Sequence, residues 1–144
     1  LGAALEMLPG AHVVDCRRDP LETAWSCYQQ LFSGGAVFCY DFAGIATYSH
    51  AYARAMDAWS RRFPERIFRH DYETLLAAPE TSIRALLDAC ALPFDAECLR
   101  FHAAARHVRT ASAAQVRAPL TANTARAARY GALLDPLRDA LAAC

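Results

Sequence analysis

The chain contains no lysine: all 15 of its basic residues are arginine. They are balanced by 15 acidic residues, so the net charge is zero with histidine counted as neutral. A protein without net charge has no long-range field that would draw it to nucleic acid or to an anionic membrane. Any anion must therefore be bound by a local cluster of arginines, and no lysine ammonium is available for chemistry.

The six cysteines include no Cys-x-x-Cys pair and no zinc-finger spacing. Cys16, Cys27 and Cys90 stand in apolar segments, so we expect them to be buried thiols of the core. No apolar run reaches the roughly 20 residues that a membrane helix needs, and Leu1–Leu8 lacks the basic start of a signal peptide. We expect no metal, no membrane span, no nucleic-acid partner and a cytoplasmic location.

A hydrophobic content of 55% over 144 residues is enough to bury the core of one domain. Leu1–Leu8 has helical spacing but no capping residue before it. We therefore expect this helix to start upstream, and residues 1–144 to be the C-terminal portion of a single domain.

Ala11–Cys16 is a short, largely apolar run, which predicts a buried parallel strand. The helix that follows starts at Pro20, with Asp19 as its N-cap and Glu22 at the third position of a capping box. We expect this helix to fade near Ser33.

Periodicity predicts the remaining elements in the same way. They are a helix over Phe42–Arg62, a strand over Arg66–His70, helices over Tyr72–Ala77 and Glu80–Ala89, a helix capped by Asp95 that ends near Ala104, and a final helical region from Tyr130 to Leu141. Arg106–Pro119 has no period and is the longest irregular segment. The order predicts an α/β fold, mostly helical, with short parallel strands.

The connection after the first strand is a candidate anion site, because open α/β sheets bind ligands there and the next helix presents free N–H groups. Arg18 adds a planar fork suited to phosphate, and Ser26 lies on the same side of the helix. The alternative is that Arg17 and Arg18 are solvated or pair with Asp15 and Asp19.

Two other segments carry polar clusters. Arg106–Arg117 offers arginines and hydroxyls without a nearby counter-charge, and it is either an anion-binding loop or a solvated surface loop. His70–Glu73 stands at a strand end, where a helix-capping role with Tyr72 packed under the sheet is favoured.

Three segments, in this order, resemble motifs of sulfotransferases that use 3′-phosphoadenosine 5′-phosphosulfate (PAPS). They are Cys16–Ser26; Asp71–Leu75 with Pro79-Glu80, Ile83–Leu87 and Leu92–Phe94; and Arg109–Leu120. The last is similar to the donor-covering segment of protein-tyrosine sulfotransferases and of bacterial tetratricopeptide-repeat sulfotransferases. The resemblance spans Leu8–Leu141 and implies a P-loop-type three-layer α/β fold, truncated at its N-terminus.

The resemblance also implies roles for individual residues. Arg18 and Ser26 would hold the 3′-phosphate of PAPS, and Tyr72 would contact its adenosine. Ser112 would lie near the transferring sulfuryl group as the catalytic, transition-state-stabilising residue. The other residues that the resemblance places at the donor are Arg109, Thr110, Gln115, Arg117 and Arg126.

The implied activity is transfer of a sulfuryl group from PAPS to a hydroxyl acceptor, with protein tyrosine as one candidate. Gln30 stands where the tyrosine sulfotransferases have an arginine, which argues against that acceptor. Tyr40, Tyr48 and Tyr52 either line an acceptor cleft or pack in the core. The only glycine pair, Gly34-Gly35, follows a helix, so we expect the glycine-rich phosphosulfate loop upstream and the chain alone to be inactive.

Two alternatives stand beside this expectation. A P-loop small-molecule kinase would use the arginine-rich segment as a phosphate lid, and it would need a Walker lysine and Mg²⁺ ligands upstream. A non-enzymatic helical interaction module would have no anion pocket between the helix at Pro20 and the segment at Arg109.

Overall fold

The computed structural model describes residues 1–32, 34–103, 117–120 and 125–143. The α-helices and strands are α1 (Gly2–Met7), β1 (Val13–Arg17), α2 (Pro20–Tyr28), α3 (Phe42–Arg62), β2 (Ile67–Asp71), α4 (Tyr72–Ala77), α5 (Pro79–Ala89) and α6 (Asp135–Ala142). The described residues also include the 3₁₀ helices η1 (Val37–Tyr40), η2 (Ala96–Ala103) and η4 (Ala127–Leu134).

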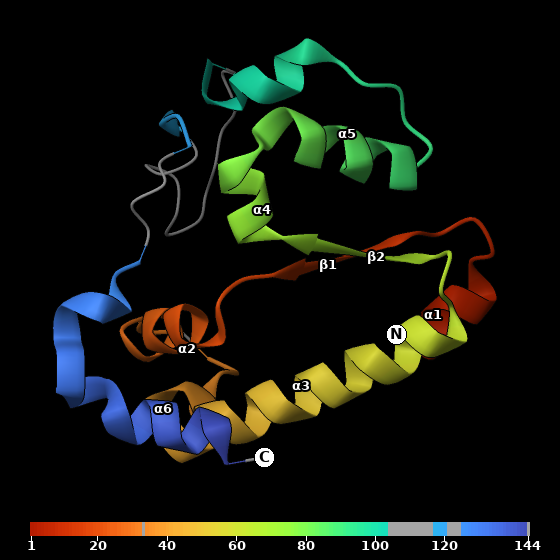
Figure 1. Ribbon diagram of the computed structural model, residues 1–144. Helices are drawn as coiled ribbons and strands as arrows, with labels where there is room; N and C mark the ends of the chain where they lie inside the picture. The colour runs from red at the N-terminus through yellow and green to blue at the C-terminus, as the bar shows by residue number, and fades with distance from the viewer. Residues whose placement is uncertain (33, 104–116, 121–124, 144) are drawn as a thin grey trace.

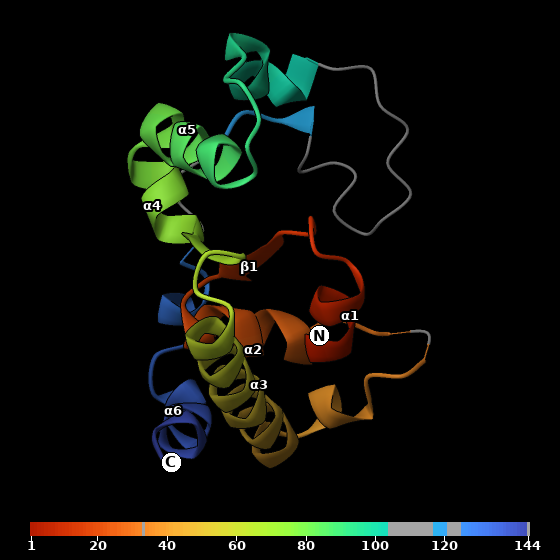
Figure 2. The same ribbon diagram turned by 90° about the vertical axis from the view of Figure 1, so that its right-hand side faces the viewer.

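The two strands form a parallel sheet, with Val13 opposite Ile67 at one end and Arg17 opposite Asp71 at the other. Helices lie on both sides of it: α4 and α5 on one side, and α2, α3 and α6 on the other (Figures 1 and 2). The mostly helical composition and the parallel pairing confirm the α/β prediction. Because parallel strands end at the same edge, the connections after Arg17 and Asp71 are brought together.

Helix α3 has the predicted bounds because its apolar stripe is long and ends before Pro64. Helix α2 stops at Tyr28, well before Ser33, because Gln29 and Gln30 bring no apolar side chain to the interface with α3. The helix predicted after Asp95 is the 3₁₀ helix η2, and Asp95 does accept a hydrogen bond at its start.

One core cluster joins α1, α3 and β2 through Leu5, Met56 and Ile67. A methyl group on Gly2 would lie 2.2 Å from the Trp59 ring, so glycine is what lets α1 approach α3 this closely. The guanidinium of Arg66 donates to the Leu5 carbonyl oxygen within α1 at 2.8 Å, and to the carbonyl oxygens of Leu8 and Ala11 after it. A second cluster joins α2, α3 and α6 through Ala24, Ile45 and Leu137.

The cysteine prediction is wrong for Cys16, which is exposed, while Cys27 and Cys90 are half-buried. Side chains alternate along a strand, and Asp15 takes the buried position beside Cys16. The buried thiol of the described part is Cys39. No helix in that part is long and apolar enough to cross a membrane.

Leu137 has no exposed surface and closes the second cluster, so Leu137→Ala should lower the free energy of unfolding by about 2–5 kcal/mol. Urea denaturation measures this change. Leu133→Ala is the matched control: that leucine is 77% exposed, so its loss should change stability by less than about 0.5 kcal/mol. Equal effects of the two substitutions would contradict the placement of α6.

Candidate functional site

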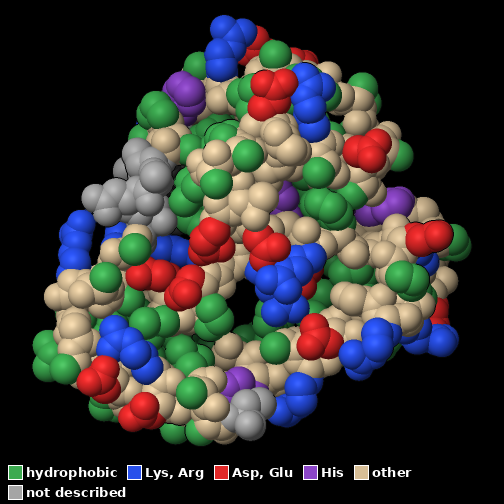
Figure 3. All heavy atoms as spheres, in the orientation of Figure 1, with side chains coloured by type: hydrophobic (Ala, Val, Ile, Leu, Met, Phe, Trp, Pro, Cys, Tyr) green, Lys and Arg blue, Asp and Glu red, His purple; other side chains and the backbone are tan. Residues whose placement is uncertain are grey.

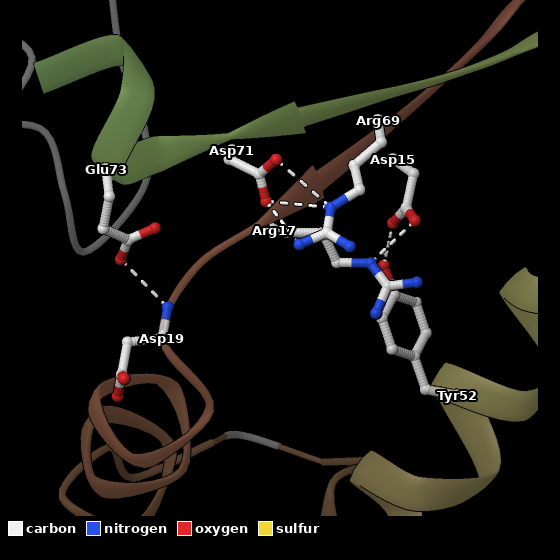
Figure 4. A network of polar contacts seen from close by, with 7 residues as sticks. All are labelled: Asp15, Arg17, Asp19, Tyr52, Arg69, Asp71 and Glu73. Atoms are coloured by element: carbon white, nitrogen blue, oxygen red, sulfur yellow. Dashed lines mark hydrogen bonds and ion pairs between the residues drawn. The ribbon is translucent and has the colours of Figure 1, made fainter. Parts of the chain in front are cut away.

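A buried carboxylate ties β1 to α3. The Asp15 side chain is 3% exposed and accepts a hydrogen bond from Arg17 Nε at 2.7 Å. It also accepts from the Tyr52 hydroxyl, and the Arg17 guanidinium lies 4.8 Å from the centre of the Tyr52 ring (Figure 4). Of the two possibilities for Arg17, the pairing with Asp15 is therefore the one that the structure shows.

The same network changes the acidity of Tyr52. Partial burial of the phenol, followed by the hydrogen bond to Asp15 and its negative charge, raises the pKa of Tyr52 from 10 to about 12, and Arg17 acts in the opposite direction. The phenol proton thus stays on Tyr52 and is engaged with Asp15. Tyr52 is a structural donor here and is poorly suited to be a general base.

β2 carries a matching pair on the same face of the sheet. Arg69 donates to Asp71, with Nη2–Oδ1 at 2.8 Å, and the pairing raises the pKa of Arg69. In the sheet register Asp15 stands opposite Arg69, and Arg17 opposite Asp71, so the four charges alternate. Within the segment His70–Glu73, for which a capping role was predicted, the Asp71 side chain makes no cap hydrogen bond to α4, whereas Glu73 accepts from the Asp19 amide at the start of α2.

Arg18 lies at the start of α2 and faces α4. Its Nη2 is 3.4 Å from Glu22 Oε2, and its guanidinium is 5.3 Å from the centre of the Tyr72 ring. The structure therefore brings together Arg18 and Tyr72, two residues that the sequence assigned to one ligand from positions far apart in the chain.

The predicted capping box at α2 forms only in part. Asp19 Oδ1 accepts from the Glu22 amide at 2.8 Å, as predicted. The return hydrogen bond is different: the Asp19 amide donates to Glu73 Oε1 at 2.9 Å, from 54 residues away (Figure 4). The Glu22 carboxylate instead accepts from the amides of Arg126 and Ala127, each at 2.9 Å. The Arg126 amide and the Arg18 guanidinium therefore meet at the same carboxylate.

Of the other predicted site residues, two are described and exposed, and the rest fall outside the described residues. Ser26 lies one turn beyond Glu22 on α2 and is exposed. Arg117 is exposed. The predictions for Arg109, Thr110, Ser112 and Gln115 fall outside the described residues.

A cleft of about 460 Å³ opens between β1, the start of α2 and α3. Arg17 and Arg18 line one part of it, and the rings of Phe38, Tyr48 and Tyr52 line another. Figure 3 shows the face of the molecule hollowed near its centre, where arginine and acidic side chains gather. Within this cleft Tyr48 stacks on Phe38, with ring centres 4.0 Å apart.

Tyr40 does not line the cleft; its hydroxyl donates to the Phe32 carbonyl oxygen at 3.2 Å. Among the residues that the structure describes, no group of three or more His, Cys, Asp or Glu side chains is arranged to hold a metal ion.

Sequence reasoning missed the roles of three carboxylates. Asp15 did carry a signal, because an acidic residue within an apolar strand needs a buried partner. The partners of Glu22 and Glu73 lie 104 and 54 residues away, and no local pattern marks them.

Residues 1–96, two thirds of the chain, match the model of the sulfotransferase family. The chain belongs to the sulfotransferase family. A protein of Aquifex aeolicus (strain VF5), named only as an uncharacterized protein, is 34% identical over 145 residues, which cover 98% of this chain and 19% of that protein. The chain thus spans about a fifth of the length of this relative. No solved structure matches this chain.

Alkaline titration tests the Asp15–Tyr52 contact. The folded protein holds the Tyr52 proton up to a pH of about 12, whereas the unfolded chain releases it near 10, so this stabilising contribution is present below pH 10 and is lost as the pH rises between these values. The difference in phenolate absorbance between the native protein and Tyr52→Phe should have its midpoint near 12. Asp15→Asn should move the midpoint down, and a native midpoint near 10 would contradict the contact.

Proposed function

We propose that the protein is a PAPS-dependent sulfotransferase with a P-loop-type fold, and that this chain binds the adenosine 3′-phosphate end of the donor. The observation that carries the proposal is the position of Arg18. In a member of the sulfotransferase family, it stands at the connection between β1 and α2, with the Tyr72 ring against its guanidinium.

The chemistry of these residues fits a nucleotide phosphate. The guanidinium offers a planar fork of donors that matches phosphate oxygens, and the first turn of α2 adds a favourable dipole. Tyr72 provides an aromatic face next to that fork, suited to a purine ring. Ser26 lies on α2, eight residues after Arg18, and its exposed hydroxyl can add one more donor.

The proposed reaction breaks the bond between sulfur and the bridging oxygen of the phosphosulfate and forms a bond from sulfur to the acceptor oxygen. The acceptor proton passes to a base outside this chain, and 3′-phosphoadenosine 5′-phosphate leaves. Such in-line transfers depend on positioning and on stabilising charge in the transition state. We assign this stabilising role to Ser112. The residues proposed to close over the donor with it are Arg109, Thr110, Gln115 and Arg117.

We further propose that a hydroxyl-bearing acceptor enters the cleft between α2 and α3. The cleft adjoins Arg18, and its aromatic rings can hold a flat or apolar molecule. Arg17 is neutralised by Asp15, and Arg18 lies beside Glu22, so charge does not favour a strongly acidic peptide. Protein tyrosine is thus the weaker candidate acceptor.

Arg18→Ala should weaken the binding of 3′-phosphoadenosine 5′-phosphate by roughly 2–3 kcal/mol, the scale of a lost charge-assisted hydrogen bond. Binding of adenosine 5′-phosphate, which lacks the 3′ group, should change little, and calorimetry measures both. Arg84→Ala is the matched control, because Arg84 also pairs with a glutamate at i,i+4 spacing and covers an aromatic ring, but on α5. Equal losses for the two nucleotides would refute the assignment.

Ser112→Ala should slow sulfuryl transfer about 10²-fold while leaving the affinity for 3′-phosphoadenosine 5′-phosphate nearly unchanged, because the hydroxyl acts mainly on the transition state. Single-turnover kinetics in a protein that contains the complete domain separates the two effects. Ser60→Ala, on α3, is the control and should have no effect on the chemical step. A loss of affinity equal to the loss of rate would assign Ser112 to ground-state binding instead.

A further inference from the structure

The Glu22 carboxylate has hydrogen-bond partners that its position in the sequence does not predict. It stands at the third position of α2, where the side chain of a capping-box glutamate turns back to the N-cap amide. Here Glu73 of α4 takes that amide of Asp19. The Glu22 carboxylate is therefore available to another partner.

That partner is the start of η4. Both carboxylate oxygens are used: Oε2 accepts from the Arg126 amide and Oε1 from the Ala127 amide, each at 2.9 Å. The first amides of a helix have no partner within the helix, and a negative charge there is stabilised by the helix dipole. The N-cap residue of η4, Arg126, makes no side-chain cap, and Glu22 supplies the acceptor for these amides from a helix 104 residues earlier in the chain.

The same carboxylate faces Arg18, whose Nη2 lies 3.4 Å from Oε2. One oxygen of Glu22 is thus shared between the Arg18 guanidinium and the Arg126 amide. The Glu22 side chain is only 12% exposed, so water screens these contacts weakly. The Arg18 guanidinium and the segment that starts at Arg126 therefore both contact the Glu22 carboxylate.

We propose that Glu22 is a positioning residue for the 3′-phosphate site: it holds the segment carrying Arg126 against α2 and aims Arg18 beside it. The proposal rests on the proposed function, since the 3′-phosphate is the group that Arg18 would receive. Glu22 does not bind the phosphate itself, because two anions repel. Its effect on the ligand passes through the Arg18 guanidinium and through the segment that starts at Arg126.

The test uses two substitutions of Glu22 and one control. Glu22→Gln keeps one acceptor oxygen and loses the charge, and Glu22→Asp keeps the charge but shortens the side chain by one methylene. Glu80→Gln is the control, because Glu80 pairs with Arg84 at the same i,i+4 spacing on an exposed helix face. The hydrogen bonds from the Arg126 and Ala127 amides to Glu22 are called the tether here. The exchange rates of these two amides, measured by NMR without ligand, report the tether independently of any nucleotide.

Calorimetry with 3′-phosphoadenosine 5′-phosphate and with adenosine 5′-phosphate reports the site. In Glu22→Gln the two amides should exchange at least about tenfold faster, and the preference for the 3′-phosphorylated nucleotide should fall about tenfold. Glu22→Asp should retain part of that preference, because the charge remains. A general loss of stability would weaken the binding of both nucleotides equally, and that result would overturn the positioning role.

Other results also overturn the proposal. Unchanged exchange rates would show that the tether is absent, and faster exchange with an unchanged preference would show that it does not serve the site. If the native protein itself does not prefer the 3′-phosphorylated nucleotide, the proposed function fails together with this role, and the exchange rates still show whether Glu22 caps η4.

Discussion

Two glutamates meet at the first turn of α2, and the arrangement of the candidate site depends on which amides they accept from. Glu73 takes the amide at the helix start, which leaves Glu22 to cap η4. Three segments far apart in the chain therefore meet at one point: the end of β1, the start of α4 and the start of η4. A local capping box would have used Glu22 within its own helix and left η4 without this partner.

The parallel pairing of β1 and β2 makes this meeting possible. It places the C-terminal ends of the two strands at the same edge of the sheet, so that the connection at Arg18 faces Tyr72 at the start of α4. Tyr52 of α3 lies against the charged face of the sheet, where its hydroxyl donates to Asp15. A carboxylate buried in this way requires its donors, because an unpaired buried charge is strongly unfavourable. The sheet and α3 are therefore tied by polar contacts as well as by packing.

Local patterns predicted most of the elements. The bounds of α3 and α4 agree with the periodicity, because an apolar stripe and a proline mark them directly. The end of α2 and the exposure of Cys16 were predicted wrongly, because both depend on which surfaces neighbouring segments cover. Arg18 and Tyr72 were predicted as site residues from motifs, and their contact follows only from the strand pairing.

The amino-acid pattern alone was sufficient for the α/β class and for the parallel strands, since periodicity and caps are local properties. The tertiary structure decided which carboxylate serves which donor. Asp19 has acceptors available both three residues along the chain and in α4, and sequence spacing favours the nearer one. The packed chain places Glu73 at 2.9 Å from that amide and leaves Glu22 to the amide of Arg126. A hydrogen bond depends on distance in space, and separation along the chain does not determine it.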